Sequence, residues 1–120
     1  ENLPKEIIKY VKELGFEKNQ YHAYINVQKP GKMTTLHQDN QNYASNKLGV
    51  DSKDLNRFLV FLTDWNMGEN FCVIDECIVN WKSGDCYTFD TEDWHWGCNA
   101  GYETKYTLVI STIKEVINNG

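Results

Sequence analysis

Apolar residues are spaced differently in the first and the later parts of the chain. Over residues 3–14 they recur at helical intervals, with Pro4 in the first turn and Gly15 directly after the last turn. Over residues 21–28 apolar and polar positions alternate, which indicates a strand with one buried face. His22 falls on the polar side of that strand, so we expect it at the surface. The pattern predicts an amphipathic helix that covers one face of a sheet, followed by strands.

The rest of the chain alternates short apolar runs with turn sequences. Pro30-Gly31 is a turn signal that precedes a predicted strand at residues 33–37. Residues 40–56 are polar and are predicted to form a long loop or a short helix. Further strands are predicted at residues 57–63, 71–74, 77–81, 86–89, 94–98 and 105–113. Strands joined by short turns, without helices between them, predict a mainly β fold, an antiparallel sandwich or barrel.

Length and charge exclude some classes of function. The chain has 120 residues, enough to bury one core, and we expect a single domain over residues 1–120. Its net charge is −5 and Arg57 is its single arginine. It therefore has no basic face that could neutralise phosphates, and we expect no nucleic-acid partner.

The cysteines bear on the cellular compartment. No two of them have the C-x-x-C spacing of a structural zinc site, although their number leaves a disulfide pair open. The sequence also has no signal-peptide pattern and no apolar run long enough to span a membrane. We therefore expect a cytoplasmic protein without membrane contact, with reduced and mostly buried thiols at Cys72, Cys77, Cys86 and Cys98.

Candidate metal ligands occur in two distant segments. His37 and Asp39 are separated by one residue, and in an extended chain such side chains project from the same face. His95 lies in another predicted strand. Two imidazoles and one carboxylate can bind one side of a metal ion and leave the other side open, as non-haem Fe(II) oxygenases require. By itself H-x-D is more often an exposed pair, and His95, between Trp94 and Trp96, would also suit an aromatic-packed core.

Three linked segments resemble the prolyl-4-hydroxylase-like family of 2-oxoglutarate/Fe(II)-dependent oxygenases. They are residues 30–40, which contain the H-x-D pair, residues 81–89, which contain a Gly-Asp turn, and residues 95–105, which run from a histidine to a lysine. The resemblance implies a double-stranded β-helix, a jelly-roll or cupin-like barrel, over about residues 21–113. The N-terminal helix at about residues 3–14 would cover it.

The same resemblance implies a role for each candidate residue. His37, Asp39 and His95 would be the catalytic residues that bind Fe(II). Lys105 would bind the far carboxylate of the cosubstrate 2-oxoglutarate, and Thr107, on the same face of its strand, would add a hydrogen bond. Such an enzyme uses O2, with ascorbate as an accessory reductant, to hydroxylate a C–H bond, and it releases succinate and CO2.

The resemblance also implies a peptidyl or free amino-acid side chain as the prime substrate. Thr34 stands near the place where many relatives have a tyrosine that helps to hold the cosubstrate. Arg57 is one candidate for a contact with this substrate, and an ion pair with Asp51 or Asp54 is an equal alternative for it. The competing hypothesis is a cupin-like or degenerate barrel that binds a metal or ligand without oxygenase activity, which would have no need of Lys105. Candidate substrate contacts are Asn40, Asn42, Tyr43 and Arg57.

Overall fold

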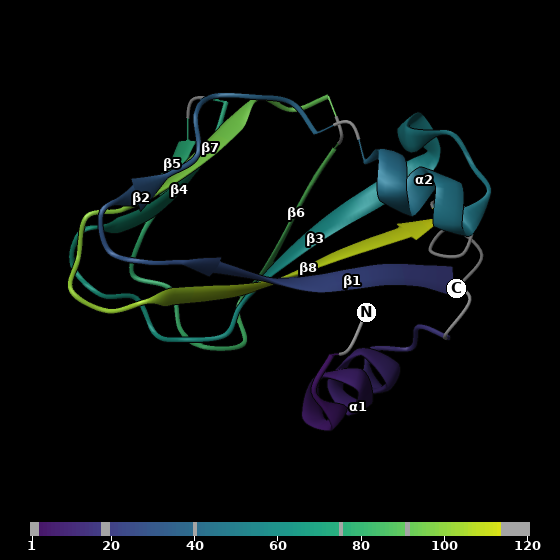
Figure 1. Cartoon of the computed structure of the whole chain (residues 1–120), viewed down its shortest axis with the longest axis horizontal. Helices are drawn as coiled ribbons and strands as arrows, with labels where there is room; N and C mark the ends of the chain where they lie inside the picture. The colour runs from purple at the N-terminus through teal and green to yellow at the C-terminus, as the bar shows by residue number, and fades with distance from the viewer. Residues whose placement is uncertain (1–2, 18–19, 40, 75, 91, 114–120) are drawn as a thin grey trace.

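The computed structural model describes residues 3–17, 20–39, 41–74, 76–90 and 92–113. Two helices, one short 3-10 helix and eight strands make up this part of the chain (Figure 1). In chain order they are α1 (Lys5–Glu13), β1 (Tyr21–Gln28), β2 (Lys32–Met33), α2 (Asn42–Leu48), η2 (Ser52–Asp54), β3 (Leu55–Phe61), β4 (Glu69–Val73), β5 (Glu76–Ile78), β6 (Cys86–Asp90), β7 (His95–Asn99) and β8 (Lys105–Ile113).

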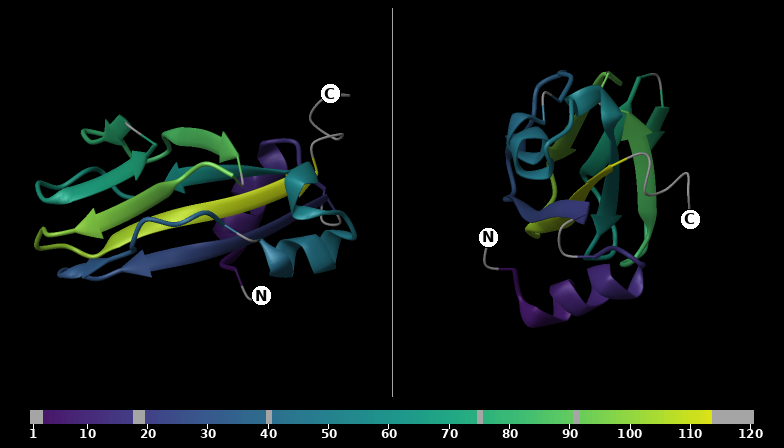
Figure 2. Two further views of the ribbon diagram at one scale, coloured as in Figure 1. Left: turned by 90° about the horizontal axis from the view of Figure 1, so that it is seen from above. Right: turned by 90° about the vertical axis from the view of Figure 1, so that its right-hand side faces the viewer.

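The strands form two antiparallel four-stranded sheets. One has the order β1-β8-β3-β6 and the other has the order β2-β7-β4-β5. Figures 1 and 2 show the two sheets facing each other, with α1 on the outer side of the first sheet and α2 near one end of β1. The prediction of a mainly β fold with an N-terminal helix is confirmed. Of the two alternatives for the polar stretch at residues 40–56, the short helix is the one present: α2 and η2 lie within it, and Leu55 already begins β3.

Two groups of apolar side chains hold these layers together. The apolar stripe of α1 packs on the outer face of the first sheet, where Val11 belongs to one buried cluster with Ala23 and Leu108. Between the sheets, the ring of Trp81 stacks on Phe61 with centroids 3.9 Å apart. Trp81 is 2% exposed, so it contributes to the core as a fully buried aromatic side chain.

The polar face of β1 lines a cavity between the two sheets, although Asn26 on this face stays exposed. Tyr24, Asn26 and Gln28 line a cavity between the sheets, and Gln28 is buried. His22 is 9% exposed, and its ring lies 4.7 Å from the ring of Tyr43. The prediction of a surface position for His22 is therefore wrong. Alternation identifies two faces of a strand but not what packs against each face, and in β1 His22 and Gln28 on the polar face are buried as Ala23 on the apolar face is.

The cysteines also differ from expectation. Cys72 and Cys77 form a disulfide that joins β4 to β5, so the prediction of reduced cysteines is wrong for this pair. Cys86 and Cys98 are free thiols; Cys86 is exposed and Cys98 is half-buried, which does not match the expected burial. The spacing of the cysteines along the chain does not identify this disulfide. The pair depends on the antiparallel register of β4 and β5, which places Cys72 opposite Cys77.

None of the helices in the described ranges has the length and apolar character needed to cross a membrane.

Candidate metal centre

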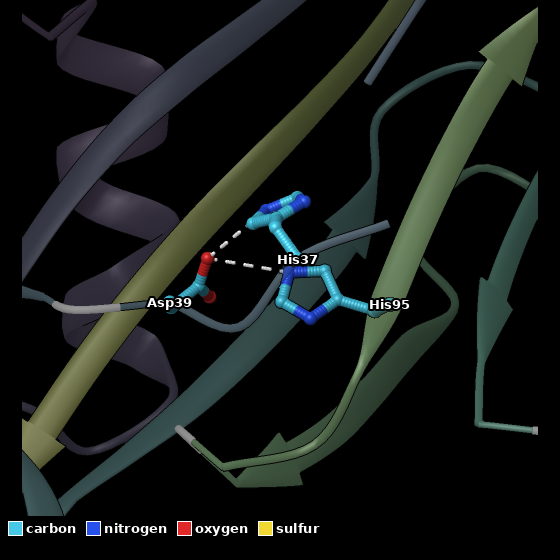
Figure 3. A group of neighbouring side chains, drawn as sticks. All are labelled: His37, Asp39 and His95. Carbon is cyan, nitrogen blue, oxygen red and sulfur yellow. Dashed lines mark ion pairs between the residues drawn. The ribbon is translucent and has the colours of Figure 1, made fainter. Parts of the chain in front are cut away.

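The three predicted metal ligands come together between the two sheets (Figure 3). His95 begins β7, and His37 joins it through a single β-bridge, in which each backbone N–H donates to the other residue's carbonyl at 2.9–3.0 Å. The Oδ1 atom of Asp39 lies 3.4 Å from Nε2 of His37 and 3.2 Å from Nε2 of His95. The candidate ligand atoms of the three residues all lie within 4.8 Å of one another.

Backbone carbonyls orient both imidazoles. Nδ1 of His37 lies 2.6 Å from the carbonyl oxygen of Thr35, and Nδ1 of His95 lies 2.9 Å from that of Asp93. A carbonyl oxygen only accepts, so we assign the ring proton to Nδ1 in each case. In the neutral rings both Nε2 lone pairs then face the carboxylate of Asp39. A cation between these electron-rich atoms removes the conflict, and the donor set fits a divalent transition metal.

The surroundings of His95 shift the proton affinities at the site. Burial raises the pKa of Asp39, but the hydrogen bond that it accepts from Nε2–H when His95 is protonated and the charge of Arg57 outweigh this, and the net pKa is lowered. Burial lowers the pKa of His95, but its bonds to Asp39 and to the Asp93 carbonyl outweigh this, and the net pKa is raised. His95 packs against Phe89, with ring centroids 4.7 Å apart, whereas Trp94 is half exposed. His95 is therefore buried by phenylalanine and keeps Nε2 directed at Asp39.

Arg57 contacts the carboxylate of the candidate ligand Asp39 rather than Asp51 or Asp54. Its Nε atom lies 2.7 Å from Oδ2 of Asp39. Its two terminal nitrogens donate to Tyr24 Oη at 2.6 Å and to Gln41 Oε1 at 3.3 Å. The alternative of an ion pair with Asp51 or Asp54 is therefore wrong, because Arg57 pairs with Asp39 instead. By holding Oδ2, Arg57 leaves Oδ1 of Asp39 directed at the two histidines.

Lys105 and Thr107 line the same cavity as the three candidate metal ligands. The cavity has a volume of about 200 Å³, and both residues line it from β8. Lys105 is 5% exposed, and its Nζ donates to Gln28 Oε1 at 3.2 Å and to the Asn70 carbonyl at 2.9 Å. Burial lowers the pKa of Lys105 to about 8, although the charge of Glu69 opposes this. A buried ammonium group thus lies in a cavity that is also lined by the three candidate metal ligands.

The structure places the remaining candidates unequally. Tyr43 is exposed and lines a neighbouring cavity of about 310 Å³, which also reaches His37, Asp39 and Arg57. Asn40 lies outside the described residues, as does the side chain of Asn42. The Oγ atom of Thr34 accepts a hydrogen bond from the Gly97 N–H at 2.8 Å.

Three residues that contact the site were not predicted from the sequence. Tyr24 and Gln41 hold Arg57, and Gln28 holds Lys105. The available signal was the polar face of β1, since both Tyr24 and Gln28 lie on it. Gln41 has a left-handed backbone conformation directly before α2, and the sequence carries no signal for its contact with Arg57.

Comparison with known proteins identifies the fold. No family model matches this chain, and no curated protein matches it. Its structure is similar to that of a predicted oxalate decarboxylase from Thermotoga maritima, with a TM-score of 0.56 and 16% identity over 92% of this chain and 75% of that one. It is also similar to a cupin protein from Bacteroides fragilis, with a TM-score of 0.56 and 14% identity over 78% of this chain and 66% of that one.

A third similar structure is a sugar phosphate isomerase of the cupin superfamily from Silicibacter pomeroyi. Its TM-score is 0.55 and its identity is 14%, over 84% of this chain and 54% of that one. At these identities the likeness establishes the fold alone. The prolyl-4-hydroxylase-like family stays a prediction, and the chain has the cupin-type double-stranded β-helix fold.

Proposed function

We propose that this chain binds a divalent metal ion through His37, Asp39 and His95, and a small carboxylate ligand between that ion and Lys105. The observation that carries the proposal is the convergence of both Nε2 atoms on Oδ1 of Asp39, with both Nδ1 protons engaged by backbone carbonyls. Histidines held in this way by a second layer of hydrogen bonds are typical of metal ligands.

The chemistry of Lys105 supports a carboxylate ligand. A buried ammonium group is costly unless an anion or hydrogen-bond acceptors compensate it. Gln28 and the Asn70 carbonyl supply two acceptors, and the group has three N–H bonds. A carboxylate in the cavity would take the third, and the hydroxyl group of Thr107 lines the same cavity. The cavity is large enough for a small organic acid only.

The more specific proposal is a 2-oxoglutarate- and Fe(II)-dependent dioxygenase that hydroxylates a peptidyl or free amino-acid side chain. Bound Fe(II) would supply the activation of O2 that couples this hydroxylation to the release of succinate and CO2. The chain's own residues would hold the metal from one side, orient the cosubstrate through Lys105 and Thr107, and exclude water with Phe71 and Phe89, which line the cavity. The open coordination side of a two-histidine, one-carboxylate site supports this chemistry.

The alternative is a cupin-type barrel that binds a metal and a ligand without oxygenase activity. The fold comparisons favour it, since the similar structures include a cupin protein, a predicted oxalate decarboxylase and a sugar phosphate isomerase of the cupin superfamily. Both proposals need the same metal ligands, so loss of metal binding cannot separate them. They differ in whether 2-oxoglutarate is converted to succinate once O2 is admitted.

An anaerobic titration tests the shared part of the proposal. Fe(II) and 2-oxoglutarate added to the metal-free chain should produce the visible metal-to-ligand charge-transfer band. His37→Ala and His95→Ala should abolish it. Lys105→Met should weaken 2-oxoglutarate binding at least about tenfold, because a charged hydrogen bond is lost. Lys32→Met removes an exposed lysine and is the matched control, with no change expected. A band that survives in both histidine variants would refute the metal site.

Admitting O2 then separates the two functions. Succinate formed only with Fe(II), and lost in His95→Ala, supports the dioxygenase. Binding of metal and 2-oxoglutarate without any succinate, even over many hours, supports the barrel without oxygenase activity.

A further inference from the structure

Gly97 is the residue of β7 that follows His95 on the same face of the strand. Side chains alternate along a strand, so positions 95 and 97 both face the cavity, and Gly97 lines it. Two residues of strand span about 6–7 Å, so Gly97 lies that much deeper than His95. The metal ligands are thus at one level of the cavity, and Gly97 is at the level of Lys105.

The glycine provides space rather than a special backbone conformation. Its φ angle is not in the left-handed region that favours glycine. A Cβ atom added here would lie 3.4 Å from Nζ of Lys105, 3.5 Å from the Asn70 carbonyl oxygen and 3.7 Å from Cδ1 of Phe71. These are ordinary contact distances, so alanine fits without displacing the backbone. Its methyl group would, however, fill the space beside the ammonium group.

That space matters because of how Lys105 is held. Gln28 and the Asn70 carbonyl accept two of its hydrogen bonds, and the ammonium group has one further N–H to offer a ligand. A ligand carboxylate needs room within about 3 Å of Nζ to accept that bond. A methyl group 3.4 Å from Nζ would occupy part of that approach.

We infer that Gly97 determines the length of the acid that the site accepts, by leaving room for the far carboxylate of a five-carbon 2-oxo dicarboxylate to reach Lys105. The inference rests on the proposed function, since it assumes that the 2-oxo acid end lies at the metal. A three-carbon 2-oxo acid such as pyruvate has the same metal-binding end but stops short of Gly97. The glycine should therefore matter for the longer acid and not for the shorter one.

Calorimetry of the Co(II)-loaded chain tests the inference without any turnover. Gly97→Ala should bind Co(II) and pyruvate within about twofold of the wild type, and should bind 2-oxoglutarate at least about tenfold more weakly. In the Lys105→Met background, Gly97→Ala should cause no further loss, because the two changes remove the same interaction. Trp96→Phe, which alters the opposite face of the same strand, is the control and should change none of the three constants.

Each other outcome has a definite meaning. Equal binding of 2-oxoglutarate by Gly97→Ala and wild type would overturn the inference while the proposed function stands. A parallel loss of Co(II), pyruvate and 2-oxoglutarate binding would also overturn it, since the glycine would then serve the strand rather than the ligand. A wild type that binds no Co(II) would refute the proposed function and the inference with it. Should Gly97→Ala not fold, Lys105→Met must still weaken 2-oxoglutarate and spare pyruvate, and equal loss of both would refute the assumed ligand orientation.

Discussion

Lys105 should lose its proton more easily in the folded chain than in the unfolded chain. It is 5% exposed, and burial lowers its pKa from 10.5 to about 8, even though the charge of Glu69 acts in the opposite direction. Between these two pH values the unfolded chain therefore binds more protons than the folded chain. The free energy of unfolding must then rise with pH across this window, so the metal-free protein should gain stability from pH 8 to pH 10.5.

The expected size follows from the difference between the two pKa values. Each pKa unit corresponds to about 1.4 kcal/mol, so keeping Lys105 charged in the fold costs about 3 kcal/mol below pH 8. Raising the pH from about 7 to about 9.5 should recover about 2 kcal/mol of this. Lys105→Met has no proton to lose at this position, so it should show none of the gain.

Urea unfolding of wild type and Lys105→Met at about pH 7 and about pH 9.5 measures the effect, with metal removed by chelation. The quantity of interest is the stability of wild type minus that of the variant, because every other titrating group is shared and cancels. This difference should increase by about 2 kcal/mol in favour of wild type at the higher pH. A difference that stays constant, or that moves the other way, would refute the assignment of Lys105 as a buried ammonium with a lowered pKa.

Three further changes should alter stability by amounts that unfolding in urea at neutral pH can measure. Arg57→Met should cost about 3 kcal/mol in the metal-free chain, because it leaves the Asp39 carboxylate, which is 11% exposed, without its counter-charge; added Co(II) should recover part of the loss, and no loss would contradict the ion pair. Trp81→Ala should cost about 3–5 kcal/mol, since it empties a fully buried position in the core; a loss below about 1 kcal/mol would mean that the site collapses. Cys77→Ser should cost about 2 kcal/mol, because it opens the short loop closed by Cys72, and equal stabilities of oxidised and reduced wild type would argue against the disulfide.

The spacing of apolar residues was sufficient to predict an element where one of its faces is apolar and the other is polar. The predicted helix at residues 3–14 contains α1 (Lys5–Glu13), and the predicted strand at residues 105–113 coincides with β8 (Lys105–Ile113). For His37 and Asp39, the spacing predicted that the two side chains lie close together, but it did not predict the backbone that carries them. The predicted strand at residues 33–37 is reduced to β2 and one bridge, so the two side chains converge through an extended loop that His95 anchors.

The sequence by itself determined the order of the elements and the chemical types that the site requires. Helical and strand periods, turn residues and the set of two histidines, one aspartate and one lysine are all local properties of the chain. Residue type and spacing indicated His37, Asp39 and His95 as candidate metal ligands, and the family resemblance indicated Lys105. The structure places all four residues along one cavity.

Only the tertiary structure decided which face of each strand turned inward and which partners met. Lys105 and its acceptor Gln28 are 77 residues apart, and the Arg57–Asp39 pair depends on how β3 lies beside the loop after β2. Such contacts follow from which strands pair, and β1 and β8 pair although they lie at opposite ends of the chain, so a local pattern does not identify the partner. The burial of His22 and the room beside Gly97 have the same origin, because a side chain's environment is set by the element packed against it.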